Sequence, residues 1–176
     1  MAAKEAVAER PTHLRSTGEV DWDALYADHL PRIYNYFRFR LAAQADVEDL
    51  TARTFEKAWS ARDRYRRDLA GFATWLYRIA HNLCIDHLRS RREHAPLDAA
   101  SVIAAERTPE IDAERRSDLT RLAALTASLS DRERELIALK YGAGLSNRAI
   151  APLVNLSESN VGTILHRTVQ ALRSQW

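Results

Sequence analysis

The chain has 176 residues, of which 46% are hydrophobic and 28% charged, with a formal net charge of +2 at pH 7. This composition excludes collagen-like, disulfide-rich and strongly disordered classes and fits one soluble domain or two small ones. The single cysteine, Cys84, excludes an internal disulfide framework and fits a reducing compartment. No apolar run approaches 18 residues, and the N-terminus lacks the apolar core of a secretory signal. We therefore expect a cytoplasmic protein with no membrane insertion.

Helical periodicity dominates the sequence and sustained strand alternation is absent, so the predicted fold class is all-α, with two small helical domains joined by a flexible linker. The polar N-terminus, residues 1–20, is typical of a flexible arm. A first domain is predicted over 21–94, a linker over 95–117 and a second domain over 118–176. Both domains are mildly basic and the linker is acidic. A linker of this length implies that the two domains can move relative to each other.

The first domain begins with two predicted helices, over 22–43 and 46–60. Pro31 should kink the first of these or start a second segment. Asp46 is the predicted N-cap of the second helix, with Asp49 three residues later. The acidic first turn is explained by capping alone, or it forms a docking surface for a basic partner.

A loop rich in arginine follows, with Tyr65 among Arg62, Arg64, Arg66 and Arg67. Basic residues around an aromatic ring suit single-stranded nucleic acid, because phosphate attraction and base stacking act together. The alternative is a solvated loop whose tyrosine packs against the core.

The longest predicted helix, 72–92, has one continuous apolar face. Its other face carries a line of polar side chains three or four residues apart: Arg78, Asn82, Asp86, Arg89 and Arg92. Arginine neutralises phosphate and asparagine can hydrogen-bond a base edge, so this face suits nucleic acid. A solvated face whose last arginines favour the helix dipole is the alternative.

The second domain contains a predicted helix that starts at a capping box of Ser130 and Glu133 and stops at Gly142. A helix over 119–129 precedes it. A short helix over 146–154, a tight turn at 155–156 and a longer helix over 157–173 follow, with apolar spacing that packs two helices across the turn. This pattern predicts a helix-turn-helix whose second helix enters the major groove. A helical hairpin without a DNA role is the alternative.

Three stretches together resemble the bacterial RNA polymerase sigma factors of the sigma-70 family, extracytoplasmic-function (ECF) group. They are DVEDLTARTFEKAW at 46–59, DRYRRDLAGFATWLYRIAHNLCIDHLRSRR at 63–92 and GLSNRAIAPLVNLSESNVGTILHRTVQALR at 144–173. The resemblance implies that 21–94 is sigma region 2 and 118–176 is sigma region 4. It further implies a factor without enzymatic activity or cofactor that binds core RNA polymerase and directs promoter-specific initiation.

The resemblance also implies roles for residues by position. Residues expected to contact the clamp helices of the largest polymerase subunit are Asp46, Glu48, Asp49, Leu50 and Arg53. Residues expected to bind the −10 element are Tyr65, Arg66, Arg67, Asp68, Arg78, Asn82, Asp86, Arg89 and Arg92. Residues expected to bind the −35 element are Ser157, Ser159, Asn160, Thr163, His166 and Arg167. Further partners that it implies are the polymerase flap, promoter DNA and an anti-sigma factor.

The sequence departs from the family pattern in both domains. Ala52 and Arg53 replace a Gln-Glu pair, which reverses one charge on the expected polymerase-binding helix. In the second domain, Pro152 falls inside the predicted short helix, and Gly162 and Ile164 stand where more basic residues are usual. We therefore expect weak or unusual −35 recognition.

Two other functions compete with this interpretation. The first is a helix-turn-helix regulator that binds duplex DNA without polymerase. The second is an enzyme with a metal or redox site formed by His81, Cys84 and His87 beside Asp86. The helix geometry disfavours this site, because six residues at 100° each turn His87 about 120° away from His81.

Overall fold

Helices are the only regular structure in the parts of the chain that the computed structural model describes, residues 21–66, 71–94 and 128–175. This confirms the all-α class. The elements are α1 Trp22–Arg40, α2 Gln44–Ser60, η1 Arg62–Arg64, α3 Phe72–His94, α5 Asp131–Ile137, η2 Ala138–Gly142, α6 Asn147–Ile150 and α7 Glu158–Gln175. The predicted arm and linker lie outside the described residues, as does nearly all of the helix predicted over 119–129.

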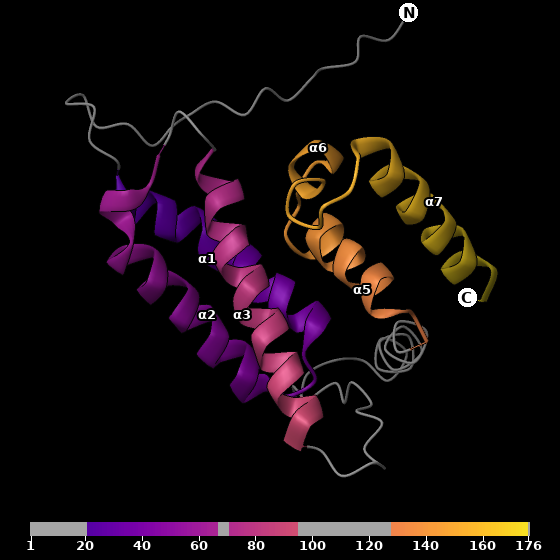
Figure 1. Cartoon of the computed structure of the whole chain (residues 1–176), viewed down its shortest axis with the longest axis horizontal. Helices are drawn as coiled ribbons and strands as arrows, with labels where there is room; N and C mark the ends of the chain where they lie inside the picture. The colour runs from indigo at the N-terminus through magenta and orange to yellow at the C-terminus, as the bar shows by residue number, and fades with distance from the viewer. Residues whose placement is uncertain (1–20, 67–70, 95–127, 176) are drawn as a thin grey trace, which may run out of the picture.

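Helices α1, α2 and α3 form a three-helix bundle (Figure 1). Helix α1 runs without interruption through Pro31, so the predicted second segment is wrong. Buried Leu25 and Ile33 flank the proline along the inner stripe of α1. Packing of that stripe stabilises the helix on both sides of the proline, because most helical stability in proteins comes from tertiary burial.

Helix α2 begins two residues earlier than predicted, and its N-cap is Ala43, without a side-chain hydrogen bond. The prediction of Asp46 as the N-cap is therefore wrong. The Asp46 carboxylate instead contacts α3, where Arg91 Nη1 donates to it at 2.9 Å and His87 Nε2 lies 3.4 Å away. Asp46 thus ties α2 to α3.

In the second domain, the predicted capping box at the start of α5 is confirmed. Ser130 Oγ accepts from the backbone N–H of Glu133, and the Glu133 carboxylate accepts from the backbone N–H of Ser130. Hydrogen bonds from the hydroxyl and backbone N–H of Ser130 lower the pKa of the Glu133 carboxyl. The helix continues as one π-helical turn, η2, to Gly142.

We expect Ser130→Ala to destabilise the first turn of α5 by about 1 kcal/mol, because the Glu133 N–H loses its acceptor. Faster hydrogen exchange of the α5 amides would measure this loss. Ser60→Ala, at the exposed end of α2, is the control and should leave those rates unchanged. Equal exchange in both variants would show that the capping box contributes nothing.

The helix-turn-helix is formed as predicted, although its first helix is shorter. Ser146 caps α6, and Ser157 Oγ accepts from the Asn160 N–H at the start of α7. Helix α6 ends at Ile150, so Pro152 lies in the following turn and not inside the helix, as the sequence had suggested. A proline in that turn does not interrupt the α6 hydrogen bonds.

The two domains pack against each other, with α1 lying on η2 and α5 (Figure 1). One cluster of buried apolar side chains runs through both domains without a break. It includes Ile33, Tyr36 and Phe37 of α1 and Leu136, Leu139 and Ala143 of the second domain. The described residues therefore form one packed body, and buried apolar side chains continue across the boundary between its two domains.

Candidate nucleic-acid and polymerase interface

Helix α3 presents the polar face that its sequence predicted. Arg78, Asn82, Asp86, Arg89 and Arg92 are all exposed. Leu76, Ala80, Leu83 and Cys84 on its other side are buried in the core. Because the helix is anchored along its whole apolar side, the polar line is held on a rigid support that can lie along a nucleic-acid strand.

The loop between α2 and α3 places its tyrosine against aromatic rings. The Tyr65 ring centroid lies 5.6 Å from that of Phe72 and 5.1 Å from that of Trp75, and the tyrosine is half-buried. Tyr65 therefore packs against the first domain, as the second interpretation of this loop expected. Arg66 is exposed, whereas Arg67 and Asp68 lie outside the described residues.

The candidate polymerase-binding residues on α2 divide by exposure. Glu48, Asp49 and Arg53 are exposed, and Arg53 Nη1 lies 3.4 Å from the Asp49 carboxylate. Leu50 has only 1% of its surface exposed, so its expected contact with polymerase stays a prediction that the free surface does not support. Its side chain belongs to the apolar stripe that packs α2 on its neighbours, and a direct contact would require this core to open.

The recognition helix α7 also has two faces. Ser157, Ser159, Asn160, Thr163, His166 and Arg167 are exposed along or just before it. Val161 and Leu165 are buried on the other side. Gly162 faces α6, because a Cβ atom there would lie 3.3 Å from Asn147 Nδ2. The position at which the family pattern has more basic residues is thus used for helix packing.

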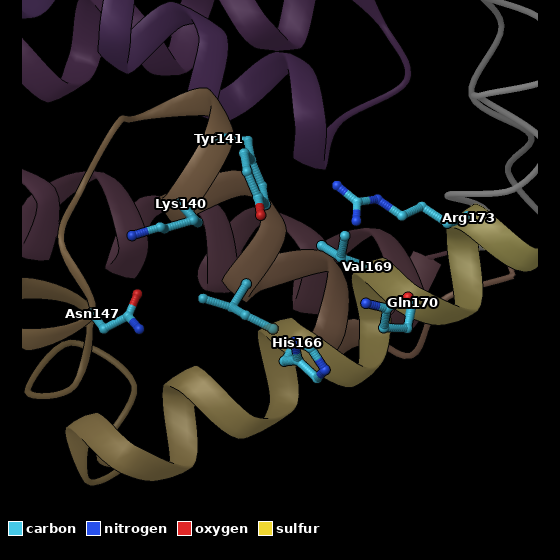
Figure 2. A pocket seen from close by; sticks show the side chains of 8 residues that line it. Lys140, Tyr141, Asn147, His166, Val169, Gln170 and Arg173 are labelled. Carbon is cyan, nitrogen blue, oxygen red and sulfur yellow. The ribbon is translucent and has the colours of Figure 1, made fainter. Parts of the chain in front are cut away.

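A hollow of about 350 Å³ lies between η2 and α7 (Figure 2). Its lining includes two basic side chains, Lys140 and Arg173, together with His166 and Tyr141. Arg173 extends across the hollow toward Tyr141 (Figure 2). This lining favours an acidic or phosphate-bearing occupant beside the recognition helix.

A buried polar cluster at the domain boundary was not predicted from the sequence. Glu135 of α5 is its centre. The Tyr36 hydroxyl donates to Glu135 Oε1 at 2.8 Å, and His81 Nδ1 lies 2.9 Å from the same oxygen. Arg40 Nε lies 2.8 Å from Glu135 Oε2, as an ion pair without well-aligned hydrogen-bond geometry.

The electrostatics of this cluster follow from burial. Burial and then the neighbouring Glu135 charge raise the pKa of the Tyr36 hydroxyl, which therefore stays protonated as a donor. Burial acts to lower the pKa of Arg40, but the charge of Glu135 and other neighbours outweighs it and raises that pKa. Charged and polar groups at apolar-stripe positions, such as Arg40 one turn after Tyr36, were the sequence signal for this cluster.

Comparisons with known proteins identify the family of the two domains. Residues 25–94 match the family Sigma-70 region 2, and residues 119–172 match Sigma-70, region 4. The chain is 31% identical over 156 residues to the ECF RNA polymerase sigma factor SigW of Bacillus subtilis, covering 82% of each chain. The chain belongs to the ECF sigma factors. The resemblance seen in the sequence is thereby confirmed.

Other relatives extend this comparison. The chain is 28% identical to the ECF sigma factor BldN of Streptomyces coelicolor, covering 88% of this chain and 60% of BldN. Among solved structures, CnrH in complex with the cytosolic domain of CnrY has a TM-score of 0.65 at 26% identity, covering 88% of this chain and 86% of CnrH. RpoE of Bartonella quintana, in complex with the anti-sigma factor NepR, has a TM-score of 0.72 at 21% identity. The match covers 88% of this chain and 96% of RpoE, and it shows that the two proteins share a fold.

The residues of the alternative metal site have other contacts in this sigma factor. His81 faces Glu135, and Cys84 is fully buried, which raises the pKa of its thiol to about 11. Within the described residues no group of three His, Cys, Asp or Glu side chains is placed to hold a metal ion. In the same ranges, no helix has the length and apolar character needed to cross a membrane.

Proposed function

We propose that this ECF sigma factor binds core RNA polymerase through the exposed face of α2 and directs initiation at its own promoters. Region 2 reads and melts the −10 element, and region 4 reads the −35 element. The observation that carries the proposal is the two-faced α3, whose exposed line of arginines and Asn82 lies on a helix anchored in the core. The protein acts by binding, without catalysis and without a cofactor, in the cytoplasm.

The chemistry of α3 suits a melted strand. Exposed arginines neutralise successive phosphates, while an asparagine side chain can donate to and accept from a base edge. Flipping a base out of the duplex costs stacking energy, which a pocket for the extruded base offsets. The adjoining loop with Arg66, and with Arg67 and Asp68 outside the described residues, would complete that pocket.

Polymerase docking is supported by the exposed charges of α2. Glu48 and Asp49 offer carboxylates, and Arg53 adds a positive charge one turn later. These residues would contact the clamp helices of the largest subunit, with region 4 on the flap. Since RpoE is bound by the anti-sigma factor NepR and CnrH by the cytosolic domain of CnrY in their structures, we further propose an anti-sigma partner for this chain.

Run-off transcription with purified core polymerase on genomic fragments tests the function, and Asn82→Ala tests the −10 surface. We expect start sites that depend on this protein, and a loss of about 5- to 150-fold in their use in the variant, from a base contact of about 1–3 kcal/mol. Asn35→Ala, an exposed asparagine on α1, is the matched control.

Each outcome of this experiment separates the alternatives. If the protein binds core polymerase but produces no start sites, region 4 is the part of the protein that fails to recognise the promoter. No binding to core polymerase would reject the sigma function in favour of a DNA-binding regulator. Equal activity of the Asn82 and Asn35 variants would remove Asn82 from the −10 surface.

A further inference from the structure

One large aliphatic side chain is exposed on the polar face of α3. Among the residues that the structure describes, the large apolar side chains that are exposed are Tyr26, Trp59, Ile85 and Tyr141. Tyr26 and Trp59 each pack against another aromatic ring, and Tyr141 lines the hollow beside α7. Ile85, with 43% of its surface exposed, is the aliphatic member of this group. A single exposed isoleucine is ordinary in a soluble protein, so its position on the helix decides whether it has a role.

Ile85 lies in the middle of the line of exposed polar side chains along α3. The line advances by four, three and four residues through four exposed side chains, Arg78, Asn82, Ile85 and Arg89. This spacing keeps side chains on one straight stripe of a helix. At about 100° per residue, Ile85 lies about 20° around the helix axis from Arg78, whereas Asp86 lies about 80° away. The centre of the candidate nucleic-acid surface is therefore apolar, and the Asp86 carboxylate stands at its edge.

The side chain of Ile85 is held in one direction. Leu83 and Cys84, the two residues before it, are buried in the core, so α3 cannot rotate at this turn. A β-branched side chain in a helix has one strongly preferred χ1 rotamer. Ile85 therefore presents its methyl groups on a rigid support and loses little conformational freedom when it binds.

The arginines on either side of Ile85 indicate the kind of surface that it meets. Arg78 and Arg89 are separated by about 16 Å along the helix. The major groove of duplex DNA is about 12 Å wide. A helix that lies across this groove can place one guanidinium on each phosphate backbone. Asn82 and Ile85, between the two arginines, would then lie over the base edges.

The base edges in the major groove offer one apolar group, the 5-methyl group of thymine. Ile85 follows Asn82 by three residues, or about 4.5 Å along the helix. Successive base pairs are stacked about 3.4 Å apart. The two side chains are therefore close enough to contact the same base pair or its neighbour.

We propose that Ile85 recognises a thymine in the double-stranded part of the −10 element by packing against its 5-methyl group, beside the base that Asn82 contacts. This inference rests on the proposed sigma function and adds a specificity-determining residue to it. Cytosine has no methyl group at this position, and purines present polar atoms there, so both leave Ile85 without an apolar partner. The protein would therefore prefer an A·T pair at this position.

Removal of one methyl group from the DNA tests the contact, because deoxyuridine pairs as thymidine does but lacks the 5-methyl group. The full-length protein and core polymerase transcribe a promoter found in the run-off experiment. Each thymine of its −10 element and of the adjoining duplex is replaced singly by deoxyuridine. We expect one of these replacements to lower initiation by the wild type about fourfold, the effect of leaving one methyl group unburied.

Ile85→Ala should lower initiation on the thymine template at least as much, and it should use the thymine and deoxyuridine templates equally. This variant should keep its fold, because Ile85 is exposed and alanine favours a helix. Ile85→Val keeps part of the apolar surface and should keep part of the thymine preference. Tyr26→Ala, which truncates an exposed apolar side chain of α1, is the matched control and should retain the fourfold ratio.

Three results would overturn the assignment of Ile85. They are equal use of every template by the wild type, a thymine preference that persists in Ile85→Ala, and weaker binding of Ile85→Ala to core polymerase without DNA. The last result would place the side chain against protein.

A failure of the proposed function gives a different result, because the wild type then directs no initiation on any template. Genomic fragments amplified with dTTP or with dUTP then test the Ile85 contact by their retention on the full-length protein. Stronger retention of the thymine fragments by the wild type, and not by Ile85→Ala, would support the contact. Equal retention of both kinds of fragment by the wild type would overturn it.

Discussion

Replacing Arg40 with methionine is expected to open the two domains of the free protein. Arg40 and Glu135 are both nearly inaccessible, and the substitution leaves the carboxylate buried without its counter-charge. Removing one partner of a buried ion pair costs about 3–5 kcal/mol. Separation of the domains limits that cost, because it brings the orphaned carboxylate into water while each domain stays folded.

Glu135→Gln should open the protein for the converse reason. The amide oxygen can still accept from the Tyr36 hydroxyl, but the Arg40 guanidinium loses its counter-charge. The double variant, Arg40→Met with Glu135→Gln, removes both charges and should close again, since replacing a whole buried pair with neutral groups is often neutral or stabilising. The effects of the two single substitutions should therefore be strongly non-additive.

Energy transfer between two dyes measures all four states of this cycle, with the dyes attached to cysteines that replace the exposed residues Lys57 of α2 and Ser174 of α7 while the buried Cys84 stays unlabelled. Arg38→Met, on the exposed side of the same helix, is the matched control and should change stability by less than about 0.5 kcal/mol. Additive effects of the two single substitutions would show that Arg40 and Glu135 do not interact in solution.

Features that depend on neighbours in sequence were predictable. The capping box at Ser130, the cap at Ser157 and the turn around Asn155, whose φ is +54°, follow local rules that the sequence displays directly. The exposed line on α3 follows from the 3.6-residue period alone. Local hydrogen bonding and helical periodicity thus account for most of the elements and for the exposure of the candidate surfaces.

Features that depend on distant residues were not predictable from local rules. Tyr36 and Glu135 are 99 positions apart, and no local pattern indicates that they meet. Asp46 fits a capping rule, yet its carboxylate pairs with Arg91, 45 positions away. Gly142 fits a helix-stop rule, yet the left-handed residue that follows is Gly144, with φ of +71°. Contacts with residues that are distant in the sequence therefore determine what these side chains do.

Replacing Leu50 with alanine should abolish polymerase binding by unfolding region 2, and not by removing a contact. Leu50 is buried among the core side chains of the first domain. Truncation of a buried leucine costs about 2–5 kcal/mol, as lost burial plus the cavity that remains. Such a loss is a large part of the stability of a domain of this size.

Two measurements distinguish this explanation from a direct contact. Three of the four tryptophans, Trp22, Trp59 and Trp75, lie in region 2, so tryptophan fluorescence during urea unfolding, measured with Trp176 replaced by Phe, reports on this domain. The midpoint should fall strongly for Leu50→Ala and should not change for Asp49→Asn, an exposed neighbour expected to lose polymerase binding alone. Cooling should restore binding by Leu50→Ala, because the folded fraction recovers, but not by Asp49→Asn. An unchanged midpoint with lost binding in Leu50→Ala would place this leucine at the polymerase surface after all.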